Sequence, residues 1–149
     1  MRAVIQRVDR ASVIINHQEL SSINEGILIL LGVEREDTEV DADYILKKAI
    51  NLRIFEDEQD KMNRSLLDIN GAMMVVSQFT LLGDCVKGRR PSFVAAEEPA
   101  KANKLYEYFV KKAKEKVNSL ATGKFQEMMK IELVNNGPVT ILLNSRKII

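Results

Sequence analysis

The stretch ILILLGV, residues 27–33, contains no polar side chain and lies between Glu25 and Glu34. A continuous apolar run of this length is typical of a strand that is covered on both faces. The segment after it has helical spacing, because its apolar residues fall on one stripe: Ala42, Ile45, Leu46, Ala49 and Ile50. Glu36-Asp37-Thr38 precedes this stripe with N-cap chemistry. We therefore predict a buried strand and then a helix over about 38–51, the pattern of an α/β fold.

The remaining elements are predicted on both sides of this strand and helix. We expect further strands at residues 1–9, 11–16, 20–23, 52–55, 66–69, 72–79, 125–133 and 139–144. Asn70-Gly71 predicts a hairpin that joins 66–69 to 72–79. A second helix is expected from Pro99 to about 118, after a long loop at 83–98. The whole chain, 1–149, is interpreted as a single compact α/β domain with mixed β-sheets and two main helices.

Composition excludes several classes of protein. The 149 residues include 22 basic and 21 acidic ones, and the net charge of +1 argues against a protein that coats nucleic acid by bulk electrostatics. A single cysteine, Cys85, allows no intrachain disulfide, and a single histidine, His17, cannot build a zinc site of three histidines. No apolar window has the roughly 18 residues of a membrane helix. We therefore expect a cytoplasmic protein with no membrane contact, no metal and no cofactor.

The segment VVSQFTLLGD, residues 75–84, is the first candidate site. Strand alternation places its residues on two faces, with Gln78 and Thr80 on one and Ser77 and Phe79 on the other. Polar side chains in so apolar a strand need partners or solvent, so an edge strand with satisfied hydroxyl groups is one interpretation. The other is an oxyanion hole, because backbone N–H groups lose their ladder partners where a strand ends.

The segment VKGRRPSF, residues 86–93, concentrates positive charge beside that strand end, at Lys87, Arg89 and Arg90. It is either a solvated surface loop or a contact for the phosphates of a nucleic acid. Cys85 has no histidine to pair with, so a Cys–His nucleophile is excluded. The chain also lacks the common hydrolase and nucleotide-binding motifs. An enzyme with this sequence would work mainly with backbone groups and with functional groups of its substrate.

The segment VNNGPVTILL, residues 134–143, places Gly137-Pro138 inside an otherwise strand-like run. Proline cannot donate to a sheet ladder and Asn-Gly favours a turn, so the local pattern predicts a turn before the final strand. A cis Gly-Pro bond would instead turn both carbonyl groups outward, as a rigid backbone feature in which no side chain takes part. Met129, just before this segment, is expected to pack in the core.

Several motifs together resemble the D-aminoacyl-tRNA deacylase family. Ser77-Gln78-Phe79-Thr80-Leu81 and Asn135-Asn136-Gly137-Pro138-Val139-Thr140 are similar to its two signature motifs. Further similar segments lie at residues 2–8, 51–55, 87–93 and 123–129. Matches in this order over nearly the whole chain are highly specific. Two positions depart from the pattern common among bacterial members, because Asn136 stands in place of Asp and Arg89 in place of Asn.

The resemblance implies a cytosolic homodimer that hydrolyses the ester between a D-amino acid and tRNA. It implies that Gly137-Pro138 is cis and reaches into the pocket of the other subunit, where it rejects L-amino acids. Because glycine has no side chain to reject, we also expect hydrolysis of glycyl-tRNA, including glycine mischarged on tRNA(Ala).

The resemblance also implies roles for the other candidate residues. Ser77, Gln78, Phe79 and Thr80 line the pocket, and the backbone N–H groups of Phe79 and Thr80 hold the ester carbonyl while the 2′-hydroxyl of the tRNA assists. Supporting roles are implied for Arg7 and Met129, and tRNA contacts for Lys87, Arg89 and Arg90. Two alternatives remain open: a non-catalytic RNA-binding module, and an esterase in which Thr80 is the nucleophile.

Overall fold

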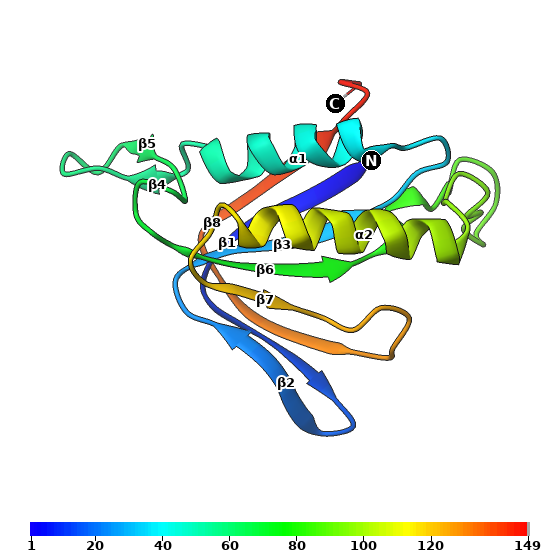
Figure 1. Cartoon of the computed structure of the whole chain (residues 1–149), viewed down its shortest axis with the longest axis horizontal. Helices are drawn as coiled ribbons and strands as arrows, with labels where there is room; N and C mark the ends of the chain where they lie inside the picture. Colours follow the sequence, from blue (N-terminus) through cyan, green and yellow to red (C-terminus); the bar gives the residue numbers. More distant parts are fainter. Residues whose placement is uncertain (149) are drawn as a thin grey trace.

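A six-stranded sheet is built around β1 (Arg2–Ile15) in the computed structural model, which describes residues 1–148. One edge of β1 pairs antiparallel with β3 (Gly26–Gly32) over its first half and with β2 (Gln18–Ile23) over its second half. Its other edge pairs antiparallel with β8 (Lys130–Asn144). Beyond β3, the sheet continues with β6 (Ala72–Ser77) and β7 (Leu120–Thr122), which pair in parallel. The sheet is therefore mixed, as the sequence predicts (Figure 1).

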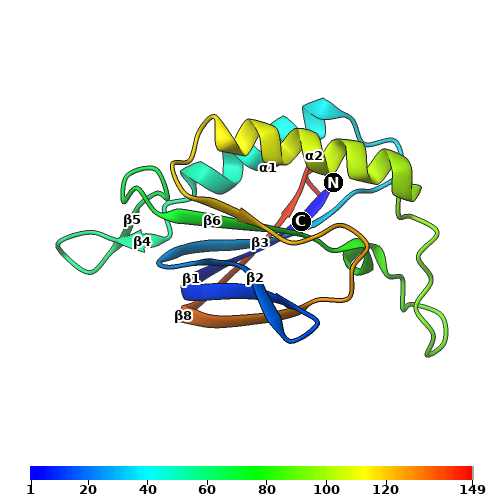
Figure 2. The ribbon, with the colours of Figure 1, turned by 60° about the horizontal axis from the view of Figure 1, so that its bottom comes forward.

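Two helices, α1 (Glu39–Asn51) and α2 (Pro99–Lys114), lie next to each other on one face of this sheet (Figures 1 and 2). The backbone N–H of Thr38 donates to the carboxylate of Asp41 at 2.8 Å and so caps the start of α1. α2 begins at a proline, whose fixed φ suits the first turn. Both helices are confirmed where the sequence predicts them, although α2 ends at Lys114 and not near residue 118.

The predicted apolar strand is confirmed as covered on both faces. In β3, Ile27, Ile29 and Leu31 pack in a core beneath the two helices. Leu28 faces a second core, formed where β1, β2 and β8 curl away from the helices (Figure 2). β1 contributes to both, with Ile5 in the first core and Val13 in the second. This curl leaves a nearly closed sheet within a single mixed α/β domain.

A small arm projects from the end of α1. It consists of β4 (Phe55–Glu56) and β5 (Met62–Arg64), which pair antiparallel (Figure 1). Within residues 1–148, neither helix has the length and apolar character that a membrane span requires.

The hairpin predicted at Asn70-Gly71 is wrong. Residues 66–69 form a turn, stabilised by the carboxylate of Asp68, which accepts from the backbone N–H of Ser65 at 2.8 Å. The strand after it, β6, pairs in parallel with β3 and β7 and not with residues 66–69. Parallel pairing joins segments far apart in the chain, so a local turn signal does not reveal it.

Other strand boundaries also differ from the predictions. The two strands predicted at 1–9 and 11–16 are one continuous strand, β1 (Arg2–Ile15), and only Phe55 of the segment 52–55 is in a strand. β6 ends at Ser77 and not at residue 79, because a short helix, η1 (Phe79–Leu82), follows it. Residues 125–129 form a loop and not a strand, and Phe125 packs with the first core whereas Met129 packs with the second.

Candidate functional site

Two backbone donors lie where β6 ends. The last ladder hydrogen bond runs from the N–H of Gln78 to the carbonyl of Leu31, at 2.8 Å. The chain then turns into η1, and the first N–H groups of a helix have no acceptor within it. Within residues 1–148, the N–H groups of Phe79 and Thr80 donate to no backbone or side-chain acceptor. They are therefore adjacent donors that a ligand can use.

Close packing fixes the position of η1. Gly32 at the end of β3 lies beneath it, and a Cβ at this glycine would stand 2.6 Å from Cδ2 of Leu82 and 3.0 Å from the carbonyl oxygen of Gln78. The guanidinium of Arg2, which is paired with Gly32 on the neighbouring strand, donates to the carbonyl of Leu81 at 3.3 Å. The backbone donors are thus positioned mainly by the close packing of η1 on β3 at Gly32.

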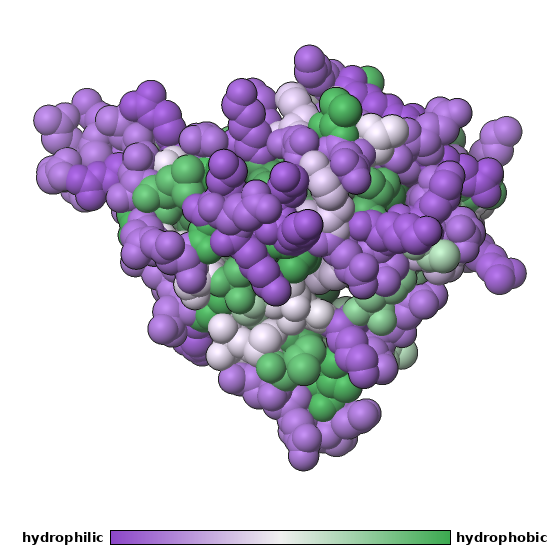
Figure 3. Space-filling view, viewed as in Figure 1, coloured by the Kyte–Doolittle hydropathy of each residue, from purple (hydrophilic) through white to green (hydrophobic). Residues whose placement is uncertain are grey.

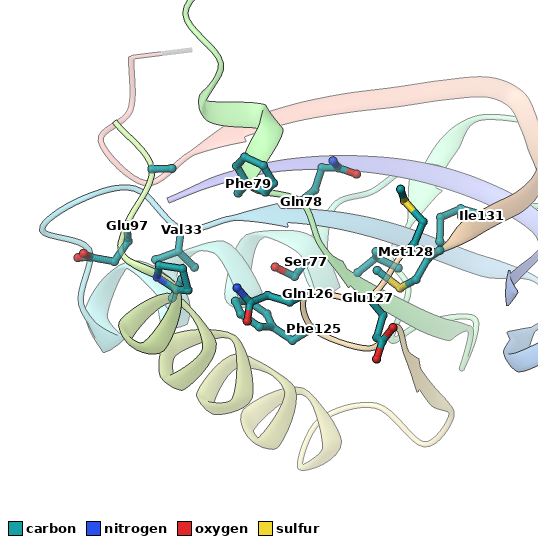
Figure 4. Close-up of a pocket in the computed structure, with 15 residues that line it drawn as sticks. Val33, Ser77, Gln78, Phe79, Glu97, Phe125, Gln126, Glu127, Met128 and Ile131 are labelled. Atoms are coloured by element: carbon teal, nitrogen blue, oxygen red, sulfur yellow. The ribbon is translucent and has the colours of Figure 1, made fainter. Parts of the chain in front are cut away.

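A cavity of about 590 Å³ opens beside this strand end (Figure 4). Its apolar lining includes Val33, Val76, Phe125, Met129 and Ile131, and Ser77, Gln78 and Phe79 line the same space. Thr80 does not line it: its side chain is exposed, and its hydroxyl accepts a hydrogen bond from the amide of Gln78. The structure therefore brings together three of the four residues of the SQFT segment and Met129, while Thr80 faces outward.

Met129 packs against the second core, as predicted, and also lines the cavity. It is partly buried, and its sulfur accepts from the backbone N–H of Lys124 at 3.3 Å. A Cβ at Gly123 would stand 2.8 Å from that sulfur, so a glycine is needed for this close approach.

A buried tyrosine attaches α2 to the strand that leads into the site. The hydroxyl of Tyr106 donates to the carbonyl of Val75 at 2.9 Å. Burial raises the pKa of Tyr106 to about 12, so the hydroxyl keeps its proton and remains a donor at neutral pH. This bond joins the cavity wall formed by the start of α2 to the wall formed by β6.

The basic loop lies next to η1. Phe93, at the end of this loop, contacts Phe79 edge to face, with ring centroids 5.1 Å apart. Paired backbone hydrogen bonds between Asp84 and Ser92, at 2.7 and 2.9 Å, close the base of the loop. Its three basic side chains, Lys87, Arg89 and Arg90, are exposed and do not line the cavity.

Gly137-Pro138 lies in a bulge and not in a turn between strands, so the local turn prediction is wrong. β8 pairs with β1 on both sides of the dipeptide, with Thr140 opposite Gln6 and Asn135 opposite Val8. Four residues of β8, 136–139, therefore stand against the single residue Arg7 of β1 and loop out of the ladder. The Gly137–Pro138 bond is cis, and both residues are exposed.

Side-chain hydrogen bonds hold this bulge. Arg7 is 5% exposed, and its guanidinium donates to the carbonyl of Asn136 at 3.0 Å and to the carbonyl of Ile54 at 2.6 Å. The amide of Asn135 bridges the base, because it accepts from the N–H of Val139 at 3.0 Å and donates to the hydroxyl of Thr140 at 3.1 Å. Arg7 thus ties the bulge to the chain that leads into β4.

The bulge and η1 of one chain are far apart. β1 and β3 lie between β8 and β6, which corresponds to about 14 Å across the sheet. Along the strands there is a second separation. Arg7 pairs with Ile27 and Ile27 pairs with Met73, so the bulge lies opposite Met73. Ser77, at the end of β6, is four residues further on, which corresponds to about 13 Å. Gly137 and Pro138 accordingly do not line the cavity of their own chain.

The family follows from a comparison with known proteins. A family model described as D-Tyr-tRNA(Tyr) deacylase matches residues 4–144. The chain belongs to this family. Relatives from Syntrophus aciditrophicus (strain SB) and Clostridioides difficile (strain 630), both named D-aminoacyl-tRNA deacylase, are 58% identical over 148 residues and 57% identical over 147. Each alignment covers 99% of this chain and 99% of the relative.

A solved structure in the comparison carries a different name. The protein called "c-Myc DNA Unwinding Element Binding Protein" superimposes on this member of the deacylase family with a TM-score of 0.92 and 38% sequence identity. The match covers 97% of this chain and 98% of that one.

Sequence reasoning missed several residues that shape the site. Gly32, Asn135 and Tyr106 act through a close approach or a hydrogen bond to a distant segment. Of the three, only Asn135 could have been identified from the sequence, because it lies in a signature motif. Among residues 1–148, no group of three or more His, Cys, Asp or Glu side chains is arranged to hold a metal ion.

Proposed function

We propose that this chain is a D-aminoacyl-tRNA deacylase, which hydrolyses the ester that joins a D-amino acid to tRNA. The observation that carries the proposal is the pair of free backbone donors at Phe79 and Thr80, beside a cavity of about 590 Å³ in a member of this family. The relatives from Syntrophus aciditrophicus and Clostridioides difficile each share more than half of its residues and bear the same functional name.

The donors stabilise the charge that develops on the ester carbonyl. Water adds to the carbonyl carbon, the bond to the terminal ribose oxygen of the tRNA breaks, and that oxygen takes up the proton. The oxygen of the tetrahedral intermediate accepts from the N–H groups of Phe79 and Thr80, as in other oxyanion holes. The cavity lining includes no histidine or cysteine, and its two carboxylates, Glu97 and Glu127, form ion pairs with Lys101 and Lys124. In the proposed mechanism the neighbouring 2′-hydroxyl of the tRNA therefore assists in place of a side-chain base.

A second copy of the chain completes the site. The bulge of one chain is about 20 Å from its own η1 by the spacing of the strands, yet its dipeptide is exposed and available to another molecule. In the homodimer that we propose, Gly137 and Pro138 enter the cavity of the other subunit. Their carbonyl groups occupy the space that an L side chain needs, whereas a D side chain points away.

Substrate selection tests whether Gly137 and Pro138 reject L-amino acids by excluding their side chains. Because glycine has no side chain, the enzyme is expected to hydrolyse glycyl-tRNA, including glycine on tRNA(Ala), as well as D-Tyr-tRNA, and to spare L-Tyr-tRNA. Release of labelled amino acid from the three substrates is measured over a wide range of enzyme concentrations. Complete resistance of glycyl-tRNA with rapid cleavage of D-Tyr-tRNA would show that the site does not select by exclusion.

Mixed dimers test whether the dipeptide acts across subunits. Gly32→Ala disturbs the donors and Gly137→Val disturbs the bulge, so each homodimer is expected to be impaired. After the two variants are mixed and allowed to exchange subunits, each mixed dimer has one intact site, and about a quarter of the wild-type activity returns. If the dipeptide served its own subunit, every site would keep one defect and no activity would return.

Thr80→Ala tests the alternative in which Thr80 is a nucleophile. Because Thr80 is proposed to act through its backbone N–H and its side chain is exposed, the variant is expected to stay within about tenfold of the wild-type rate. Loss of all turnover with tRNA binding intact would favour a covalent mechanism at Thr80.

The remaining alternative is a nucleic-acid-binding module without catalysis. The name of the DNA-unwinding-element binding protein, 38% identical to this chain, favours it. Incubation with D-aminoacyl-tRNA separates the two functions, because binding without release of amino acid supports the module and release supports the deacylase.

A further inference from the structure

The helix α2 carries an excess of positive charge in this nearly neutral chain. Its 16 residues contain five lysines and one glutamate, a net charge of +4, although the whole chain carries only +1. The rest of the chain therefore carries −3. A polyanion that approaches the molecule meets a favourable field along this helix and at the neighbouring basic loop, and an unfavourable one over the remainder.

Three of these lysines form one exposed strip, which we call the lysine ridge: Lys104, Lys111 and Lys114. At 100° per residue they fall within about 80° of one another around the helix axis. Glu107 lies in the same strip, where it accepts from the amide of Asn103 at 3.1 Å. Figure 3 shows hydrophilic side chains gathered over the region that α2 occupies in Figure 1.

The ridge lysines differ from the other two lysines of α2. Lys101 pairs with Glu97 at 3.6 Å, and Lys112 pairs with Glu115 at 3.8 Å. No carboxylate within residues 1–148 forms an ion pair with a ridge lysine. The ridge therefore holds three lysines without a direct ion pair, and with Glu107 included the strip carries a net charge of +2.

The ridge also has a fixed relation to the cavity. Pro99 and Ala102, in the first turn of α2, line the cavity, so the helix begins at the site and runs away from it. From Lys104 to Lys114 the rise of the helix is about 15 Å. A duplex places one phosphate on each strand per roughly 3.4 Å of its axis, so this length spans about four phosphates.

We infer that the lysine ridge binds the phosphodiester backbone of the acceptor arm of the tRNA whose 3′ end occupies the cavity. This rests on the proposed function for the identity of the polyanion. The contacts are to phosphates, so they supply affinity and position along the arm and carry no sequence information.

The test compares two triple variants with the same change of charge. Lys104→Gln/Lys111→Gln/Lys114→Gln removes the ridge, and Lys47→Gln/Lys61→Gln/Lys147→Gln removes three exposed lysines that lie outside α2. Each is assayed on full-length D-aminoacyl-tRNA at several salt concentrations, and on the 3′ D-aminoacyl ester of adenosine, which has no acceptor arm. Thermal melts confirm that both variants are folded.

The ridge variant is expected to lose about tenfold or more in kcat/KM on full-length tRNA at 0.15 M salt. The slope of log kcat/KM against log salt should decrease in magnitude by about 2–3, because three phosphate contacts are lost and each contributes roughly 0.7–0.9. The adenosine ester should be hydrolysed at the wild-type rate. The control variant should lie close to wild type in both assays.

Two results would overturn the inference: a ridge variant with the wild-type salt slope, or a control variant that loses as much as the ridge variant. Failure of the proposed function is distinguishable, because wild-type protein would then release no amino acid from either ester. In that event, the salt dependence of binding to uncharged tRNA is compared between the ridge variant and the control variant. A reduced slope in the ridge variant alone would still show that the ridge binds phosphates.

Discussion

The two signature segments of this chain are held in place by different kinds of interaction. η1 is positioned by close packing over Gly32 and by the ring contact between Phe79 and Phe93. The bulge at residues 136–139 is positioned by hydrogen bonds from the side chains of Arg7 and Asn135. One region presents backbone donors and the other presents backbone carbonyl groups, and neither uses a reactive side chain.

This difference predicts how each region fails. A site held by packing is sensitive to added volume, because a well-filled core has no room for another methyl group. A site held by hydrogen bonds is sensitive to the loss of a partner, since the groups left behind stay buried and unpaired. In the proposed enzyme, damage at η1 should slow all substrates alike, whereas damage at the bulge should both lower the activity and change the discrimination between substrates.

Arg7→Met is expected to have the largest effect. It leaves the carbonyls of Ile54 and Asn136 without their donor, and the cost to the free energy of unfolding should be about 3 kcal/mol. Guanidinium denaturation measures this change, and the ratio of L-Tyr-tRNA to D-Tyr-tRNA hydrolysis should rise because the bulge is no longer fixed. Arg7→Lys is the matched variant, which keeps the charge but not the forked geometry. Wild-type stability and selectivity in Arg7→Met would show that the guanidinium does not hold the bulge.

Gly32→Ala should have a smaller effect on stability. The added Cβ would stand 3.0 Å from a backbone oxygen and 2.6 Å from a leucine methyl group that can move, so overpacking should cost about 2 kcal/mol. Displacement of η1 should lower the rates on D-Tyr-tRNA and glycyl-tRNA by the same factor, about tenfold or more. A change in the ratio of the two rates would contradict the assignment of η1 to the common chemical step.

The helices and the central strand could be predicted because the spacing of apolar residues indicates which faces of an element are buried. The stripe from Ala42 to Ile50 and the run at 27–33 each encode which faces the fold covers, and the structure confirms both. The partners of a strand are not encoded in this way. β6 follows a strong hairpin signal, yet it pairs with β3, some 45 residues earlier in the chain.

The candidate site could be predicted in composition but not in arrangement. The segments at 77–81 and 135–140 could be recognised because their residues are similar to the family's signature motifs, and Gly137-Pro138 is unusual inside a strand. The bulge itself depends on β1, which supplies ladder partners on both sides and Arg7 in the middle. The exposure of Thr80 depends on η1, whose helical turn replaces the alternation expected of a strand.

Asn136→Asp should have the smallest effect of the three substitutions. The amide of Asn136 donates to Asp9 at 2.6 Å, and an aspartate at this position would put two carboxylates in contact. Because both side chains are exposed and solvent screens the repulsion, the variant should lose about 1 kcal/mol at low salt and less as salt increases. Asn136→Leu, which removes the hydrogen bond without adding charge, should show no such salt dependence. Equal salt dependence of the two variants, measured by urea denaturation, would mean that Asp9 does not contribute to holding the bulge through this contact.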